Sequence, residues 1–463
     1  MRRLAVVVVL ALAQLSWVQR SKPQVGVARD GQFDIARQMV RAALTDTLGY
    51  HLLRELSALG PRLVGSEQSM QAIRWAKRTM QELGLENVHL QEVTVPHWQR
   101  GDVEEAKVVW PKALQGKRLR VAALGGSAPT PPGGIRAPVL ELHSLEQVFT
   151  QQGQVRGKIA FFNRPMEAEL VDTFAAYGRA VDQRVQGPAE AGLAGAVAVI
   201  VRSVTTKADN MPHVGTLRYR DQAPQPPAVA VGVQDAERLA EWLRAHGQVE
   251  IELRLSCRDL GRTPSYNVIG DLRGRDRPEE VVLVGGHFDS WDQGQGCHDD
   301  AAGCIQALEV LQLFKRLGIQ PRRTVRVVFF INEEFGLDGA RAYADHAAAS
   351  SEYHLAAIES DRGAFTPRGF YVDAADSVMS RIQEWLPLLN LALIEWVRKG
   401  GSGADIAQLK GAKALIGYVP DAQRYFDYHH SGNDVFAAVH PREFELGVAA
   451  MAILTYLIAE EGL

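Results

Sequence analysis

Between residues 281 and 290 the chain reads Val281-Val282-Leu283-Val284-Gly285-Gly286-His287-Phe288-Asp289-Ser290. The first half is an unbroken apolar run of the length of a strand, and the second half carries an imidazole and a carboxylate. A strand without polar alternation is buried on both faces, which is typical of a parallel sheet covered by helices on both sides. Ligands bind such sheets at the carboxyl ends of the strands. This stretch therefore predicts a fold class and a position for a site.

Two further apolar strands end in the same way. The strand predicted at 325–331 runs into Asn332-Glu333-Glu334, and the strand at 355–358 runs into Glu359-Ser360-Asp361. The intervening segment 301–317 carries apolar residues at helical spacing. We therefore expect an α/β fold with a mixed, mostly parallel sheet sandwiched by helices. Its strands deliver ligand-type side chains to one common edge.

The length of the chain and a change of composition predict two domains. A chain of 463 residues is too long for one compact core. Residues 111–255 are rich in glycine and proline, and their predicted strands are short. We expect this segment to be a small domain inserted into a larger one made of residues 23–110 and 256–463.

The first residues have the pattern of an export signal. A basic start, Met1-Arg2-Arg3, precedes an apolar run over 4–13 that ends in Ala11-Leu12-Ala13. These are the charged, apolar and small-residue regions of a secretory signal, and the run is too short to span a bilayer. We expect a leader over residues 1–22 and an exported protein, secreted or periplasmic, without a membrane-spanning segment.

Charge and cysteine content exclude several classes of function. The formal net charge of -3 argues against a nucleic-acid binder, which usually carries a basic face. Three cysteines, Cys257, Cys297 and Cys304, form neither a disulfide framework nor zinc-finger spacing. Any metal must therefore be held by His, Asp and Glu.

Two loops add more groups of this kind, in His298-Asp299-Asp300 and in Tyr428-His429-His430. A pair of catalytic metals needs a shared carboxylate, separate ligands on each side and a further carboxylate that takes a proton from water. The adjacent Glu333 and Glu334 supply a base beside a ligand. From the residues alone, Asp300 is equally well explained as a helix N-cap, and His429 competes with His430.

Five motifs occur in a fixed order: His-x-Asp-Ser at 287–290, Gly-x-x-Asp-Asp at 296–300, Glu-Glu at 333–334, Glu-Ser-Asp at 359–361 and His-Ser-x-x-Asp at 430–434. In order and spacing they resemble the M28 family of zinc peptidases, and within it the carboxypeptidase Q branch. The resemblance covers nearly the whole chain after the leader. It implies a zinc-peptidase/phosphorylase-like fold, and it extends to 111–255, which resembles the protease-associated domain of several members.

The resemblance also implies roles for single residues. Two zinc ions would be held by one set of five ligands: His287 and Asp361 on one ion, Glu334 and His430 on the other, and Asp299 bridging both. Glu333 would be the general base, Asp289 would orient His287, and Asp434 would hold His430 from behind. The substrates would be short peptides, including dipeptides, and the enzyme a homodimer.

Several alternatives stay open. A single-zinc acyltransferase of the glutaminyl cyclase type and a metal-free binding protein share this fold, although the complete ligand set argues against both. The sequence also leaves open which end of the peptide is recognised. A carboxypeptidase needs a cation for the substrate carboxylate, and an aminopeptidase needs an acid for the ammonium group. Further candidates are cations (Arg362, Arg398, Lys399, Arg424), oxyanion donors (Tyr425, Tyr428) and residues facing the substrate (His298 and the loop 401–405).

Overall fold

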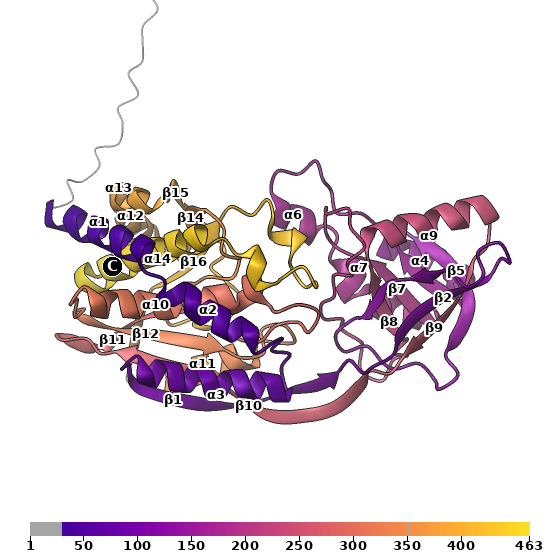
Figure 1. Ribbon diagram of the computed structural model, residues 1–463, viewed down its shortest axis with the longest axis horizontal. Coiled ribbons are helices and arrows are strands. Elements are labelled where there is room, and N and C mark those ends of the chain that lie inside the picture. Colours follow the sequence, from indigo (N-terminus) through magenta and orange to yellow (C-terminus); the bar gives the residue numbers. More distant parts are fainter. Residues whose placement is uncertain (1–29, 351) are drawn as a thin grey trace, which may run out of the picture.

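The computed structural model describes residues 30–350 and 352–463, so the leader predicted at 1–22 lies outside the described residues. Two sheets of eight strands each occupy separate halves of the molecule (Figure 1). Within the described ranges, no helix is long and apolar enough to cross a membrane.

The larger sheet has the order β1-β10-β12-β11-β13-β16-β14-β15. Its central strands β12, β11, β13 and β16 run parallel to one another, whereas β1, β10 and β14 join by antiparallel pairing. The sheet is therefore mixed with a parallel centre, as predicted. The strand bounds are β1 Glu86–Gln99, β10 Arg258–Leu272, β11 Arg277–His287, β12 Arg323–Phe330, β13 Tyr353–Glu359, β14 Pro367–Ala374, β15 Trp396–Lys399 and β16 Ala414–Pro420.

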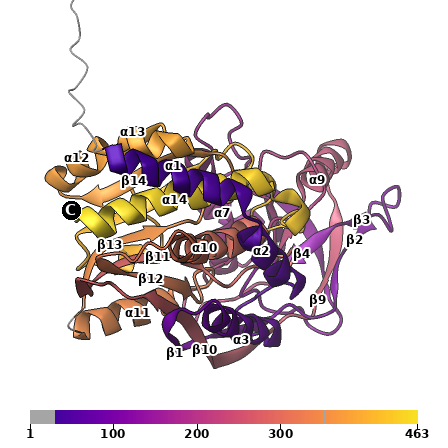
Figure 2. The same cartoon turned by 60° about the vertical axis from the view of Figure 1, so that its left-hand side comes forward.

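Both faces of this sheet are covered. Val282 and Val284 of β11 pack into the core beneath one layer of helices, while Leu283 packs into a second core on the opposite face. Figure 2 shows α1, α14 and α10 side by side in the first layer, and α11 covers the other face. The helices around this sheet are α1 Asp30–Thr45, α2 Leu48–Ala58, α3 Glu67–Glu82, α10 Ala302–Arg316, α11 Asp338–Ala349, α12 Asp376–Glu384, α13 Leu386–Leu389 and α14 Pro441–Glu461.

The smaller sheet has the order β3-β2-β9-β5-β6-β7-β8-β4 and a hydrophobic core of its own. It begins at Glu104, a few residues before the expected boundary. Its assignment to the protease-associated type stays a prediction. The strands are β2 Glu104–Trp110, β3 Arg118–Leu119, β4 Val121–Ala123, β5 Ile135–Leu142, β6 Ile159–Phe162, β7 Ala198–Arg202, β8 Ala228–Val231 and β9 Glu250–Leu255. The helices are α4 Leu145–Thr150, α5 Gln152–Val155, α6 Thr173–Gly178, α7 Asp182–Val185, α8 Gly187–Leu193 and α9 Val233–His246.

The part of the chain around the smaller sheet meets the larger half at residues 425–433 (Figure 1). The Thr205 hydroxyl donates to the carbonyl of Phe426 at 2.7 Å, and the amide of Val214 donates to the carbonyl of His430 at 2.9 Å. These contacts bring segments of the smaller half beside the carboxyl ends of the parallel strands.

Candidate metal centre

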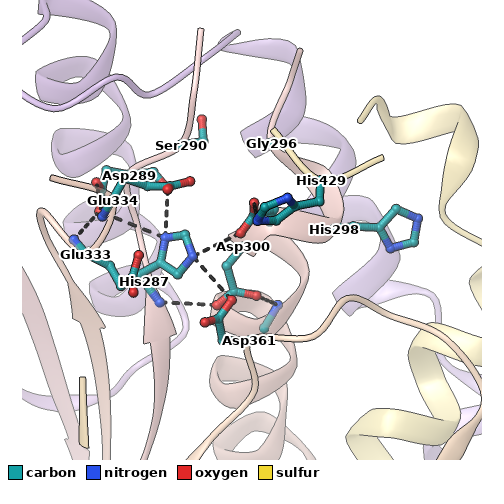
Figure 3. A network of polar contacts seen from close by, with 12 residues as sticks. His287, Asp289, Ser290, Gly296, His298, Asp300, Glu333, Glu334, Asp361 and His429 are labelled. Atoms are coloured by element: carbon teal, nitrogen blue, oxygen red, sulfur yellow. Dashed lines mark hydrogen bonds and ion pairs between the residues drawn. The ribbon is translucent and has the colours of Figure 1, made fainter. Parts of the chain in front are cut away.

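Three parallel strands bring their polar ends together, as the sequence predicts. His287 is the last residue of β11 and lies opposite Phe330, the last residue of β12, so that Glu333 and Glu334 follow close by. On the other side, Gly285 pairs with Glu359 at the end of β13, two residues before Asp361. Figure 3 shows these side chains converging from separate strands.

The candidate ligand atoms form two groups that share one carboxylate. His287 Nε2 lies 3.2 Å from Asp299 Oδ1 and 3.3 Å from Asp361 Oδ1. His430 Nε2 lies 3.0 Å from Glu334 Oε2 and 3.4 Å from Asp299 Oδ2. The two oxygens of Asp299 therefore face two different histidines, which is the arrangement that a bridging ligand requires.

These residues fit a metal centre. Asp299 Oδ2, Glu334 Oε1 and Asp361 Oδ1 are buried, and none of them has a hydrogen-bond partner in the protein. Buried polar groups are normally satisfied, so oxygens without a protein partner fit the coordination of a cation. Imidazole nitrogen and carboxylate oxygen are donors that zinc accepts.

Electrostatics lead to the same conclusion. Burial raises the pKa of Glu333 and of Glu334 well above the usual range, and the neighbouring Asp299 adds to the effect on Glu334. Burial lowers the pKa of His430 to about 3. The pKa of His287 is instead raised, against the effect of its burial, by the neighbouring Asp361 and Asp299. Crowded buried carboxylates beside the neutral imidazole of His430 are unfavourable as anions unless a cation lies among them.

His429 and His430 are distinguished by their second partners. Their rings stack with centroids 3.5 Å apart, and His429 Nε2 lies 3.9 Å from Asp299 Oδ2. His430 is the one that also approaches Glu334. Its other ring nitrogen, Nδ1, lies 3.2 Å from the carbonyl of Val214, the kind of contact that orients a ligating imidazole.

Asp289 holds the two glutamates. Its carboxylate accepts hydrogen bonds from the amides of Glu333 at 3.0 Å and Glu334 at 3.3 Å. His287 Nδ1 lies 3.0 Å from the main-chain carbonyl of Asp289 and 3.9 Å from the carboxylate. The backbone of Asp289 is therefore closer to His287 than its side chain is.

Asp434 has a different partner from the one expected. It accepts hydrogen bonds from the amides of His298 at 2.7 Å and Asp299 at 3.1 Å. The prediction that it holds His430 is wrong, because Val214 lies in that position. Asp434 instead fixes the loop that presents Asp299.

Asp300 links the helix behind the site to the strand in front of it. Its Oδ1 accepts from the amide of Gly303 in the first turn of α10 at 3.0 Å, and its Oδ2 accepts from the amide of His287 at 3.1 Å. The helix-capping explanation of Asp300 is therefore the one that its contacts support.

A pocket of about 310 Å³ opens over the ligand residues. Part of its wall is aromatic, with Phe174 and Tyr177 from α6 facing Tyr425 and Phe426. The cations in the lining are Arg184, Arg218 and Arg341. None of these three was singled out from the sequence. Arg184 and Arg218 lie in segments without any motif and reach the site only because the two halves of the chain pack together.

Of the cations that were singled out, three lie away from the pocket, and Arg362 packs behind one of its lining residues. Arg398 stacks on Trp396, Lys399 pairs with Asp376 and Arg424 pairs with Glu443. Arg362 lies with its guanidinium carbon 4.3 Å from the centre of the Phe174 ring. None of them is among the residues that line the pocket.

Other candidates divide between pocket and core. Tyr425 lines the pocket. His298 was expected to do so, but it is fully buried and stacks on Phe365 at 4.3 Å between ring centroids, beside Tyr428. Burial lowers the pKa of His298 to about 4. In the loop 401–405, Asp405 is buried beside Glu359 and is not part of the lining.

Comparison with known proteins places the chain among peptidases. Residues 267–451 match the profile of peptidase family M28. The chain is 35% identical over 437 residues to carboxypeptidase Q of Mus musculus, covering 92% of this chain and 89% of the relative. The peptidase M28 precursor of Shewanella amazonensis SB2B superimposes with a TM-score of 0.88 at 33% identity, covering 94% of this chain and 98% of that one. BSAP, a zinc aminopeptidase from Bacillus subtilis, shares the fold with a TM-score of 0.65 at 20% identity, covering 90% and 95% of the two chains.

Proposed function

The chain belongs to peptidase family M28 and is a metallopeptidase, and from that premise we propose that it is a di-zinc exopeptidase acting on short peptides, dipeptides among them. The observation that carries the proposal is the position of Asp299, whose two carboxylate oxygens face His287 and His430. A single shared carboxylate between two ligand groups is what a pair of metals a few Å apart requires.

In this proposal His287 and Asp361 hold one zinc ion, Glu334 and His430 hold the other, and Asp299 bridges them. Zinc bound there supplies a Lewis acid for the scissile carbonyl and lowers the pKa of a water molecule. The protein contributes a narrow pocket, oriented ligands and a base.

Glu333 is the proposed general base. Its amide is fixed by the Asp289 carboxylate, and its side chain lines the pocket beside Glu334. From there it takes a proton from the attacking water and later returns it to the leaving amine. Tyr425, whose side chain also lines the pocket, is the proposed donor to the developing oxyanion.

The test combines metal analysis with dipeptide hydrolysis for the wild type, Glu333→Gln and Glu241→Gln. Glu241 is an exposed carboxylate on α9 and serves as a control for the loss of one charge. We expect two zinc ions per chain in all three proteins. We expect a fall in kcat of about 10²- to 10⁴-fold in Glu333→Gln alone, the range typical of a lost general base.

Three outcomes would contradict the proposal. Near-normal activity of the Glu333→Gln variant would show that Glu333 is not the general base. One zinc ion per wild-type chain would favour an acyltransferase of the glutaminyl cyclase type, and none would favour a binding protein.

Export and self-association are separate proposals. Export rests on the leader pattern of residues 1–22, and a homodimer rests on the family resemblance. Cell fractionation with N-terminal sequencing tests whether the protein is exported and its leader removed. Analytical sedimentation tests whether it is a homodimer.

A further inference from the structure

The acidic groups in the pocket are all engaged by the proposed chemistry. The carboxylates that line it are Asp299, Glu333, Glu334 and Asp361. Three are proposed ligands and the fourth is the proposed base. No other carboxylate of residues 30–350 and 352–463 lines this pocket. A substrate ammonium group therefore finds no uncommitted acid in this lining.

The three arginines of the lining differ in their partners. Arg341 lies 3.5 Å from the carboxylate of Asp338, which also pairs with Arg262 at 2.9 Å. Arg184 is buried and donates hydrogen bonds to the Tyr177 hydroxyl at 2.7 Å and the Val214 carbonyl at 3.1 Å. Both side chains already bind the protein itself.

Arg218 is exposed, as Arg341 is, but it differs from the other two arginines in its lack of a partner among the described residues. Within the part of the chain that the structure describes, its guanidinium makes no ion pair and no hydrogen bond, although it lines the pocket. Its backbone is nevertheless fixed. The amide of Arg218 donates to the carbonyl of Val185 at 2.9 Å, and Val214, four residues earlier, is hydrogen-bonded to His430. A charged side chain on a pinned backbone is partly preorganised for a ligand.

We propose that Arg218 binds the α-carboxylate of the substrate and thereby determines which end of the peptide is recognised. The proposal rests on the proposed function and deepens it: the substrates are peptides with a free carboxyl terminus, cleaved in the carboxypeptidase or dipeptidase direction. A guanidinium presents a planar pair of N–H donors that matches a carboxylate. The aromatic wall formed by Phe174, Tyr177 and Phe426 gives the substrate side chain an apolar surface.

The chain offers a matched control two residues further on. Arg220 also belongs to the smaller half, but it forms an ion pair with Glu190 and does not line the pocket. Arg220→Gln therefore removes the same charge from the same segment without touching the proposed subsite.

The test compares a dipeptide, its C-terminal amide and its N-acetyl derivative as substrates for zinc-loaded wild type, Arg218→Gln and Arg220→Gln. For the wild type we expect amidation to lower kcat/KM by roughly 10- to 100-fold, the usual effect of losing a charge-assisted contact. In Arg218→Gln the kcat/KM of the free dipeptide should fall to that of its amide. The ratio of the two kcat/KM values should therefore approach one. Arg220→Gln should keep the ratio of the wild type, and Arg218→Lys should restore part of it.

A binding measurement provides a readout that does not depend on turnover. With Glu333→Gln as the background, calorimetry should show that Arg218→Gln raises the Kd of the free dipeptide by roughly 10- to 100-fold. The Kd of the amide should stay unchanged. A purely structural role of Arg218 would weaken both ligands equally.

Three results would overturn the inference. The first is a wild type that cleaves the amidated dipeptide normally but does not cleave the N-acetylated one. The pocket would then recognise the amino end, and the peptidase proposal would still stand. Another is a loss of discrimination in Arg362→Gln instead of Arg218→Gln. The third is equal binding of acid and amide to the Glu333→Gln protein. If the zinc-loaded wild type cleaves no peptide at all, the proposed function fails, and the same calorimetry still decides on Arg218.

Discussion

Asp299 lies between His287 and His430, and its position depends on neighbours that are not ligands themselves. Its amide donates to Asp434, and the adjacent Asp300 binds the amide of His287. These contacts hold the two carboxylate oxygens toward different histidines. The same is true of the glutamate pair, which Asp289 fixes through its backbone amides. Asp299, Glu333 and Glu334 are thus each oriented by a carboxylate that binds their backbone amides.

His354 shows how a buried titratable residue outside the site affects stability. It lies on β13, is 5% exposed, and its Nε2 is 2.9 Å from the Tyr343 hydroxyl. Burial, assisted by the charge of Arg326, lowers its pKa to about 4. The unfolded chain, with a histidine pKa of about 6.5, takes up a proton that the folded chain refuses until about pH 4. Folding is therefore weakened as the pH falls through this window.

We expect the free energy of unfolding of the wild type to lose about 2 kcal/mol through His354 between pH 7 and pH 5. The His354→Gln variant should not show this loss of unfolding free energy between the two pH values. Urea unfolding of both proteins at the two pH values measures the difference. His246→Gln, at an exposed position in α9, should keep the slope of the wild type. Equal slopes in wild type and His354→Gln would show that this histidine does not resist protonation in the fold.

At the scale of elements, α10 supports the site from behind. It begins at Ala302, directly after the loop that carries Asp299, and 13 of its 15 residues are buried. Its first turn lies so close to the end of β13 that only glycine fits at 303. A Cβ there would lie 2.0 Å from the carbonyl of Ser360 and 2.4 Å from Asp300 Oδ1. Helix α10, strand β13 and the loop that carries Asp299 therefore share one tightly packed junction.

Gly303→Ala should therefore destabilise the protein and weaken zinc binding together. Relief of the clash must move Ser360 or Asp300, both adjacent to proposed ligands, and overpacking of this kind costs about 1–3 kcal/mol. Thermal unfolding and zinc titration measure the two effects. Gly153→Ala in α5 is the control, because a Cβ there meets no atom within 4 Å. A Gly303→Ala protein with normal zinc affinity would mean that the junction yields without moving the ligands.

The elements predicted from the pattern are present, and their boundaries differ by varying amounts. The helix expected at 301–317 spans Ala302–Arg316, whereas the strand expected at 281–285 is longer at both ends and extends over Arg277–His287. Periodicity predicts such elements because each one buries a face whose spacing repeats along the chain. The beginning of the smaller sheet at Glu104 was harder to place, because only residues 100–103 separate β2 from β1 of the larger sheet.

At the scale of the whole molecule, the site belongs to both halves of the chain. Tyr177, Arg184 and Arg218 line the pocket from the smaller half. The same half holds the backbone of the loop that carries His430, through Thr205 and Val214. The smaller half is therefore a structural part of the site as well as a wall of the pocket.

Thr205→Val should reveal this dependence. Thr205 is buried, and its hydroxyl donates to the Phe426 carbonyl at 2.7 Å. Valine has nearly the same shape but leaves that carbonyl without its partner, at a cost of about 1–3 kcal/mol in unfolding free energy. We also expect zinc affinity to fall about tenfold, since the loop that carries His430 loosens.

The control for that variant is Thr130→Val. Thr130 also donates to a carbonyl, that of Leu255, but both residues belong to the smaller half. Its stability should fall by less, because the Leu255 carbonyl keeps its hydrogen bond from the Thr130 amide. Its zinc affinity, measured by chelator competition, should stay as in the wild type. Equal zinc affinities in both variants would contradict the role assigned to the interface.

The sequence by itself determined the fold class and the set of side chains at the strand ends. Both depend on local order: apolar runs specify buried parallel strands, and parallel strands point their carboxyl ends toward one edge of the sheet. The family pattern added the order of the motifs. The partner of Asp434, the burial of His298 and the presence of Arg184 and Arg218 in the pocket were decided only by the tertiary structure. These features depend on how two separately packed sheets meet, and the fit between their surfaces is summed over many side chains that carry no periodic signal along the chain.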